Sequence, residues 1–236
     1  MDISEFIESC EVDADVFALR PDYRVELIAA SGIGSSGHET TVEELLSSVE
    51  KERQESLAVE SVAEIPHLQA WRETYSSFGA KPSAYRNSAE ALIRRVPKGL
   101  PRVNPLTDLY NALSVKFAVP IGGEDLAKYS GPARLVRAQG DEEFETSSEG
   151  ESVIEYPPTG EVVWRDDVGI TCRRWNWRQS RRTALTESSR DALFILDLLE
   201  PFSQEESDLL VGELREWLTT LGADQITHRQ ITSSVR

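Results

Sequence analysis

The sequence predicts an α+β fold, a single domain in which helices pack on a mixed or antiparallel β-sheet. Helical patterns fill the chain up to about residue 130, and short strand patterns follow from Ala133 onwards. Near the C-terminus, one more helical pattern lies between two strand patterns. A length of 236 residues suits one large domain. We expect an acidic N-terminal lead over residues 1–20 and the folded domain over residues 21–236.

The first predicted elements are one strand and three helices. Residues 24–30 read as a strand because they are largely apolar and are followed by Gly and Ser residues. The sequence Thr41-Val42-Glu43-Glu44 has the spacing of a capping box and predicts a charged helix that ends near Leu57. Two further helices are predicted over residues 67–78 and 83–96.

Residues 78–124 form the most informative stretch, two amphipathic helices joined by a cationic elbow rich in Pro and Gly. The second of these helices opens at Asn104-Pro105 and closes before Pro120. Polar residues recur in it at a spacing of three, which places on one face Asp108, Asn111 and Ser114. This polar face lies close in sequence to several Arg and Lys residues, so the stretch suggests a binding site.

A Gly-Gly pair follows the helix-breaking proline of this stretch. Gly122 and Gly123 predict a loop, because two glycines allow backbone amides to approach a ligand closely. The remainder of the chain predicts short strands, at residues 133–138, 142–146, 161–167, 169–175, 192–200 and 225–232. The run 192–200 is apolar throughout most of its length and predicts a fully buried strand. Ser203 and Glu206 form a second capping box, which starts a helix that ends near Leu221.

Composition argues against a membrane protein and against a metal site. No apolar run is long enough to span a bilayer, and the N-terminus is acidic rather than shaped like an export signal. The two cysteines, Cys10 and Cys172, do not make a disulfide framework. Together with three scattered histidines they offer no metal-ligand spacing. We therefore expect a cytoplasmic protein with no metal, no cofactor and no membrane partner.

The charge distribution is uneven. A net charge of −16 argues at first against nucleic acids, whose affinity depends on phosphate neutralisation. Residues 165–182, however, contain six arginines against only Asp166 and Asp167, a local balance of +4 that leaves −20 for the rest. Such a cationic strip on an acidic body predicts capture of RNA in one orientation. The acidity itself fits either a salty cytosol or a GC-rich genome, and the sequence leaves both open.

Three separated motifs then resemble a known family. The run NPLTDLYN at residues 104–111, followed by PIG at 120–122, resembles the NPVVDVTNY…QPLHAFD signature of the B3/B4 domain. That domain is the editing domain in the β subunit of bacterial phenylalanyl-tRNA synthetase. Residues 78–86 and 172–179 resemble its free-standing relatives. The resemblance extends from about Arg20 to the C-terminus and implies a B3/B4-like fold.

The resemblance implies a trans-acting deacylase that hydrolyses misacylated tRNA with a positioned water. Asn111 aligns with an asparagine of the family's editing pocket and is the first catalytic candidate. Tyr110 stands where the family has threonine, and Gly122 stands where it has histidine, and these differences leave open which amino acid the pocket accepts. Nothing resembles a protein nucleophile, which agrees with attack by water. DNA is not an expected partner.

The arginine-rich segment CRRWNWRQ supplies further candidates. If this segment is a strand, its side chains alternate between two faces. One face would carry Arg173, Trp175 and Trp177, and the opposite face would carry Arg174, Asn176 and Arg178. The simpler interpretation is that the tryptophans pack in the core and the arginines pair with carboxylates. The resemblance favours ligand contact for Arg174, Arg178 and Gln179, with Asn176 as the second catalytic candidate.

The last candidates lie at the start of the first helix of the central stretch, the one predicted over residues 83–96. Lys81, in a Gly-Ala-Lys-Pro loop, is predicted at the mouth of the next helix, where cations and amides suit an anion. Arg86 is expected to bind substrate beside it, together with Gly122 and Gly123. A solvated lysine is the alternative. For function, the alternative to an editing deacylase is a non-catalytic module that binds an amino acid, a nucleotide or RNA in the same pocket.

Overall fold

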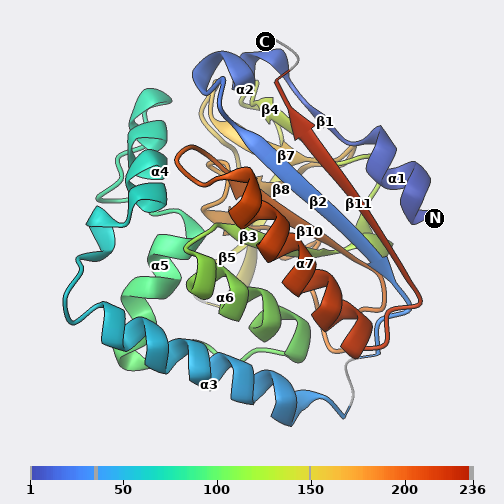
Figure 1. Cartoon of the computed structure of the whole chain (residues 1–236). Helices are drawn as coiled ribbons and strands as arrows, with labels where there is room; N and C mark the ends of the chain where they lie inside the picture. The colour runs from blue at the N-terminus through green and yellow to red at the C-terminus, as the bar shows by residue number, and fades with distance from the viewer. Residues whose placement is uncertain (1, 35–36, 149, 234–236) are drawn as a thin grey trace.

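The computed structural model describes residues 2–34, 37–148 and 150–233, and in these residues the chain folds into two β-sheets packed face to face. Helices cover the outer face of one sheet (Figure 1). The predicted α+β class is therefore confirmed. Residues 1, 35–36, 149 and 234–236, which belong to the predicted lead and domain, lie outside the described residues.

The first sheet is antiparallel throughout, with the strand order β11-β2-β10-β3. Its strands are β11 (Gln225–Thr232), β2 (Arg24–Ser31), β10 (Ala192–Leu198) and β3 (Ile121–Asp125). All seven residues of β10 are buried, as its apolar run predicts, because both faces of the strand are covered. Leu193 and Ile195 face the second sheet, whereas Phe194 and Leu196 face the helices.

Two amphipathic helices, α6 (Pro105–Phe117) and α7 (Gln204–Thr220), cover this sheet. Figure 1 shows them side by side on its outer face, with α3 (Glu39–Ser56) packed beyond α6. The predicted capping box at Ser203 and Glu206 is confirmed, because each side chain bonds to the backbone of the other residue. Asn104 caps α6 by accepting a hydrogen bond from the Thr107 amide.

The second sheet is mixed, with the order β1-β4-β7-β8-β9. Its strands are β1 (Glu11–Val12), β4 (Arg134–Arg137), β7 (Val162–Arg165), β8 (Ile170–Arg173) and β9 (Arg178–Gln179). Only the β1–β4 pairing is parallel within the described sheet. A separate hairpin joins β5 (Phe144–Ser148) to β6 (Glu151–Glu155), and the latter strand was not predicted.

The remaining helices close the edges of the two-sheet core. The acidic lead forms α1 (Ile3–Ser9) and α2 (Ala14–Leu19), and it buries Ile3, Phe6 and Ile7 in the core between the sheets. Helices α4 (Pro66–Ser77) and α5 (Ser88–Arg95) follow α3, and short 3-10 helices lie at Val62–Glu64, Val96–Lys98 and Leu126–Lys128. No described helix is both long and apolar enough to cross a bilayer.

Several predicted boundaries were wrong. Helix α3 begins at Glu39, so Thr41 lies inside it and is not a cap. Helix α5 begins at Ser88 instead of residue 83, because the Asn87 side chain accepts a hydrogen bond from the Glu90 amide and caps the helix there. The strand predicted over 169–175 ends at Arg173, and residues 174–177 form a turn.

Candidate functional site

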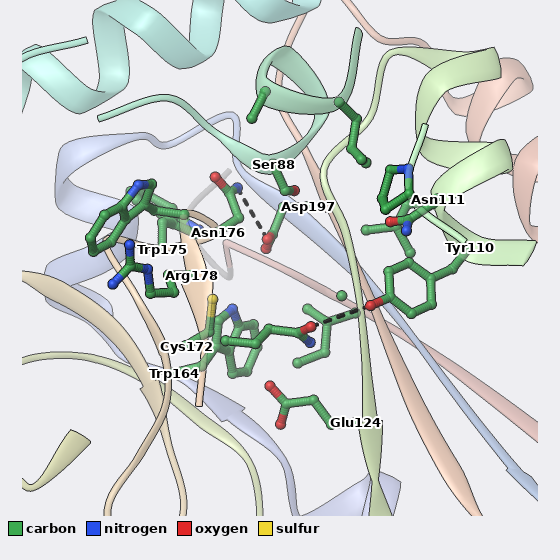
Figure 2. Close-up of a pocket in the computed structure, with 18 of the residues that line it drawn as sticks. Ser88, Tyr110, Asn111, Glu124, Trp164, Cys172, Trp175, Asn176, Arg178 and Asp197 are labelled. Atoms are coloured by element: carbon green, nitrogen blue, oxygen red, sulfur yellow. Dashed lines mark hydrogen bonds between the residues drawn. The ribbon is translucent and has the colours of Figure 1, made fainter. Parts of the chain in front are cut away.

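A pocket of about 310 Å³ opens between the two sheets (Figure 2). One wall comes from β3 and β10 of the antiparallel sheet, and the opposite wall comes from β7, β8 and the β8–β9 turn. Helix α5 and the middle of α6 complete the lining. Apolar side chains such as Ile121, Trp164 and Ile195 dominate the walls, and a few polar groups interrupt them. An apolar pocket with few polar groups is the usual form of a small-molecule site.

Helix α6 contributes Tyr110 and Asn111 to the lining, as Figure 2 shows. The Asn111 side chain is 7% exposed and makes no hydrogen bond within the described part of the chain. The other two members of the predicted polar face do not reach the pocket. Ser114 donates to the Val119 carbonyl, and Asp108 accepts from the Val103 amide. Of the three polar residues, Asn111 alone keeps its side chain available to a ligand.

Gly122 and Gly123 lie in strand β3, so the prediction of a glycine loop was wrong. Close packing requires glycine at position 123 and leaves little space at position 122. A Cβ atom on Gly123 would lie 2.6 Å from the Tyr110 ring, and one on Gly122 would lie 3.0 Å from the Gln179 amide nitrogen. Gln179 Nε2 donates to the Gly123 carbonyl at 3.1 Å, and its Oε1 accepts from the Tyr110 hydroxyl at 3.4 Å. These contacts tie the edge of one sheet to the hairpin of the other.

The β8–β9 turn replaces the strand alternation that the sequence predicted. Arg174 and Trp175 have φ values of 48° and 67°, a left-handed backbone that costs energy outside glycine. Packing around Trp175 holds it, because this side chain is fully buried against the rings of Tyr23 and Trp71. Trp175 is thus a core residue, as the simpler interpretation held. Trp177 is half-buried at the pocket.

Asn176, at the centre of the turn, is held from two sides. Its Oδ1 accepts from the Tyr75 hydroxyl at 2.9 Å, and its Nδ2 donates to Asp197 at 3.1 Å. Its backbone carbonyl accepts from the Ser88 amide at the start of α5. Asn176 lines the pocket, but its amide is committed to the protein and differs in this respect from that of Asn111.

The cationic strip of residues 165–182 is largely neutralised. Four of its six arginines pair with carboxylates, and they are Arg165, Arg173, Arg174 and Arg182. Arg173, for example, is buried between Glu161 at 2.7 Å and Glu155 at 2.8 Å. For these four arginines the structure agrees with the simpler interpretation, pairing with carboxylates. Arg178 and Arg181 are exposed and have no carboxylate partner within the described residues.

Arg174 and Arg178 differ although both were predicted to contact substrate. The Arg174 guanidinium lies over the rings of Tyr85 at 3.7 Å and Trp177 at 4.3 Å, and it does not line the pocket. Burial lowers the pKa of Arg174. Arg178 also lies over the Trp177 ring, at 4.5 Å, but it is exposed and lines the pocket. Stacking thus makes Arg174 a packing residue and leaves Arg178 accessible.

Lys81 and Arg86 lie outside the pocket lining. Lys81 is exposed in a turn and does not stand at a helix mouth, since α5 begins seven residues later. Arg86 is 3.8 Å from Glu90, a buried carboxylate that Arg72 and Arg94 also contact. The structure brings together six of the ten predicted site residues, namely Tyr110, Asn111, Gly122, Asn176, Arg178 and Gln179. Gly123 and Arg174 lie directly behind them.

Sequence reasoning missed two buried carboxyl groups in the pocket, Asp197 and Glu124. Asp197 accepts hydrogen bonds from Tyr23 at 2.5 Å and from Asn176. Glu124 accepts from the Tyr129 hydroxyl, and its second oxygen, Oε1, is buried without a partner in the described residues. Asp197 is the single charge within the apolar core of its strand, a signal that the sequence did contain. The sequence did not indicate that Glu124 is buried in a pocket, because the two preceding glycines predicted a loop.

Burial raises the pKa of Glu124 from 4.5 to about 7. Between these pH values the folded protein binds more protons than the unfolded chain, so its free energy of unfolding falls as the pH rises. Glu124→Gln removes this penalty. We expect the free energy of unfolding of the variant, relative to that of the parent, to rise from pH 5 to pH 7.5, by at most about 3 kcal/mol. Urea unfolding at each pH measures the difference.

The exposed residue Glu187 provides the control for this pH dependence. The difference in unfolding free energy between Glu187→Gln and the parent should stay constant over the same pH range. A difference that stays constant for Glu124→Gln as well would show that the Glu124 carboxyl does not titrate there.

Cys172 lines the pocket but is not poised as a nucleophile. Burial raises the pKa of its thiol well above the usual value, so the thiol stays protonated near neutral pH. No histidine belongs to the pocket lining among the described residues. Nor do those residues contain a group of three or more His, Cys, Asp and Glu able to hold a metal ion. The polar groups of the pocket can orient and hydrogen-bond a bound molecule.

Comparisons with known proteins give a family match and a structural match. The family model of the B3/4 domain matches residues 70–210. A similar solved structure is the N-terminal fragment of the phenylalanyl-tRNA synthetase β-subunit from Pyrococcus horikoshii, at 11% identity and a TM-score of 0.46. The alignment covers 95% of this chain and 54% of that one, so the chain spans about half of its length. No curated protein matches the chain.

Proposed function

Because the chain belongs to the B3/4 domain family, whose model spans more than half of its residues, we propose that it is a trans-acting aminoacyl-tRNA deacylase. Its substrate is misacylated tRNA, and its reaction is hydrolysis of the ester between the amino acid and the terminal ribose. The catalytic domain comprises residues 21–236, and the lead of residues 1–20 folds onto it. The proposed place of action is the cytoplasm.

The observation that carries this proposal is the unengaged amide of Asn111 in the pocket wall. A polar side chain that is nearly buried normally finds a hydrogen-bond partner. Asn111 lacks one among the described residues, so a ligand would complete its bonding. Its Nδ2 group is a suitable donor to an ester carbonyl, and a donor of this kind gains strength as negative charge develops on the oxygen.

The reaction needs no protein nucleophile. A water oxygen bonds to the ester carbonyl carbon while Asn111 holds the carbonyl oxygen, and the bond to the ribose oxygen then breaks. The ribose oxygen takes the proton that the attacking water loses, and free amino acid and tRNA leave. An ester is already activated, so orientation in a pocket that excludes bulk water provides much of the acceleration.

The rim of the pocket offers contacts for the end of a nucleic acid. Arg95 and Arg178 line it from α5 and β9, and both are exposed. Trp177 lies beneath Arg178 and is half-buried. A guanidinium beside an aromatic ring suits a phosphate and a stacked base at a single-stranded end.

The competing function is a binding module without catalysis. Asn176 supports it, because both ends of this amide are engaged by Tyr75 and Asp197, and of the two catalytic candidates only Asn111 keeps an unengaged amide. Such a module would hold an amino acid or nucleotide in the same pocket and release it unchanged.

A deacylation assay separates the two functions. A panel of tRNAs, each charged with a correct or an incorrect labelled amino acid, is incubated with the protein, and release of the label is followed. We expect at least one mischarged tRNA to lose its amino acid faster than the spontaneous rate, while its correctly charged form is spared. If every ester hydrolyses at the spontaneous rate, the deacylase proposal fails.

Removal of Arg178 is expected to weaken tRNA binding. Arg178→Ala should lower the affinity severalfold and reduce the dependence of log K on log salt by about one unit, the loss of one phosphate contact. Arg181→Ala makes the same change of charge at an exposed arginine outside the pocket lining and should alter both quantities much less. Filter binding across a salt series measures them. Equal effects of the two substitutions would exclude a specific contact at Arg178.

A further inference from the structure

The pocket contains two buried carboxyl groups on the same face of the antiparallel sheet. Strand register pairs Glu124 with Leu193, and Leu193 precedes Asp197 by four residues on β10. Residues 193, 195 and 197 point to one face because strand side chains alternate. At about 3.3 Å per residue, the backbone positions of Glu124 and Asp197 lie about 13 Å apart along the strands.

The space between the two carboxyl groups is apolar. Ile195 lies between them on β10, and its partner in the register is Gly122, which has no side chain. The Trp164 indole lines the pocket from the opposite sheet. Figure 2 shows Asp197 and Glu124 at separate positions in the pocket. A ligand that spans this space needs an apolar middle and a polar group at each end.

The Glu124 end is incomplete without a ligand. The side chain is 1% exposed, its Oε1 atom has no partner in the described residues, and it lines the pocket. The lining cations Arg95 and Arg178 are exposed at the rim, and Arg182 is bound to Asp166 at 2.7 Å. A buried carboxyl oxygen without a partner is costly, and a cationic donor is the group that offsets this cost most strongly.

The Asp197 end is partly satisfied and lies near the start of α5. Its two oxygens each accept one hydrogen bond, from Tyr23 and from Asn176. A carboxylate has about four acceptor positions, so Asp197 keeps capacity for a further donor. Its neighbour Asn176 bonds to the Ser88 amide, which places this end beside the helix that carries Arg95.

We propose that the pocket receives an amino acid whose side chain ends in an ammonium group. Asp197 binds the α-ammonium group, and Glu124 binds the side-chain ammonium group. In an extended lysine the two nitrogens are separated by six bonds, roughly 7–8 Å. A charge-assisted hydrogen bond of about 2.8 Å at each end gives a span of about 13 Å between the two carboxyl oxygens, comparable to the separation of the backbone positions that carry the two side chains. The methylene groups would lie along Ile195 and Trp164, and Gly122 leaves them room.

This inference rests on the proposed function only in that the amino acid arrives as an ester of tRNA. Binding is therefore tested without hydrolysis, with aminoacyl amides of 3′-amino-3′-deoxyadenosine. The lysyl amide is compared by calorimetry with the 2-aminoheptanoyl amide, in which a methyl group replaces the side-chain ammonium. We expect the lysyl amide to bind at least tenfold more tightly. Glu124→Gln should reduce that preference to within about twofold and leave the affinity for the 2-aminoheptanoyl amide unchanged.

Two more probes keep the inference falsifiable without a further protein variant. Nα-acetylation of the lysyl amide removes the α-ammonium charge and should weaken binding at least tenfold, because Asp197 then loses its partner. The tyrosyl amide presents a neutral donor and should bind more weakly than the lysyl amide. Tighter binding of the tyrosyl or 2-aminoheptanoyl amide, or an unchanged preference in Glu124→Gln, would overturn the inference.

The two proposals fail separately. Binding of the lysyl amide that depends on Glu124, in a protein that cleaves no tRNA ester, would support the inference and remove the deacylase. If the protein cleaves only tRNAs charged with apolar amino acids and shows no preference for the lysyl amide, the deacylase is supported and the inference fails.

Discussion

Replacement of Asn111 by alanine is expected to lower the deacylation rate constant on the best tRNA substrate by about ten- to a thousandfold. No described residue engages the Asn111 amide, so its loss removes a donor to the carbonyl and no bond within the fold. We therefore expect the melting temperature to stay close to that of the parent. Single-turnover deacylation with a labelled amino acid measures the rate constant.

Cys172→Ala is the matched control for this experiment, because Cys172 lines the same pocket and its buried thiol stays protonated. It should retain nearly the full rate. An Asn111→Ala variant with parental activity would contradict the role given to the amide. A covalent acyl-enzyme trapped on Cys172 would contradict attack by water.

Replacement of Trp175 by alanine is expected to lower the free energy of unfolding by about 3–5 kcal/mol, the range for truncation of a buried tryptophan. The indole is fully buried, with ring centroids 4.9 Å from Tyr23 and 5.4 Å from Trp71. Removal leaves a cavity between the two sheets and releases a turn whose backbone is left-handed at residues 174 and 175. Urea unfolding followed by circular dichroism gives the value.

Trp177→Ala provides the comparison, since Trp177 lies two residues along the same turn and is only half-buried. Its loss should reduce stability clearly less than the loss of Trp175 and should also weaken tRNA binding. Equal destabilisation by the two substitutions would mean that Trp177 belongs to the core as well.

Strong periodicity made much of the fold predictable. The helices α6 and α7 and the strands β2 and β10 were found close to their true ends, because their apolar patterns reflect burial against one another. The two helices of the acidic N-terminal lead were not predicted. They have only seven and six residues, so neither offers enough turns to establish a helical period.

The errors arose where distant residues decide the local structure. Strand β3 contains Gly122 and Gly123, which disfavour a strand on their own. Pairing with β10 nevertheless places both in a strand, and packing beneath the Tyr110 ring requires glycine at position 123. The turn at residues 174–177 carries neither glycine nor proline, and a buried tryptophan holds it instead.

Distant residues also decide how much of the cationic strip is neutralised. Arg173 finds its carboxylates at Glu155 and Glu161, twelve or more positions earlier in the chain. Counting charges along the sequence cannot reveal such pairing. Within the candidate site, Asn111 and Asn176 were placed by resemblance, whereas Glu124 became recognisable only when folding left one of its oxygens without a partner.

The β8–β9 turn also constrains how this pocket evolves. Its four residues lie in four different surroundings, with Arg174 stacked over two aromatic rings, Trp175 in the core, Asn176 in the pocket wall and Trp177 at the rim. A one-residue insertion or deletion would shift all four at once, so viable lineages should keep the length of this turn. Ala91 and Leu92 also line the pocket, but they lie in the regular helix α5 and not in this turn. Divergence of amino-acid preference among descendants is therefore expected to accumulate on that helix.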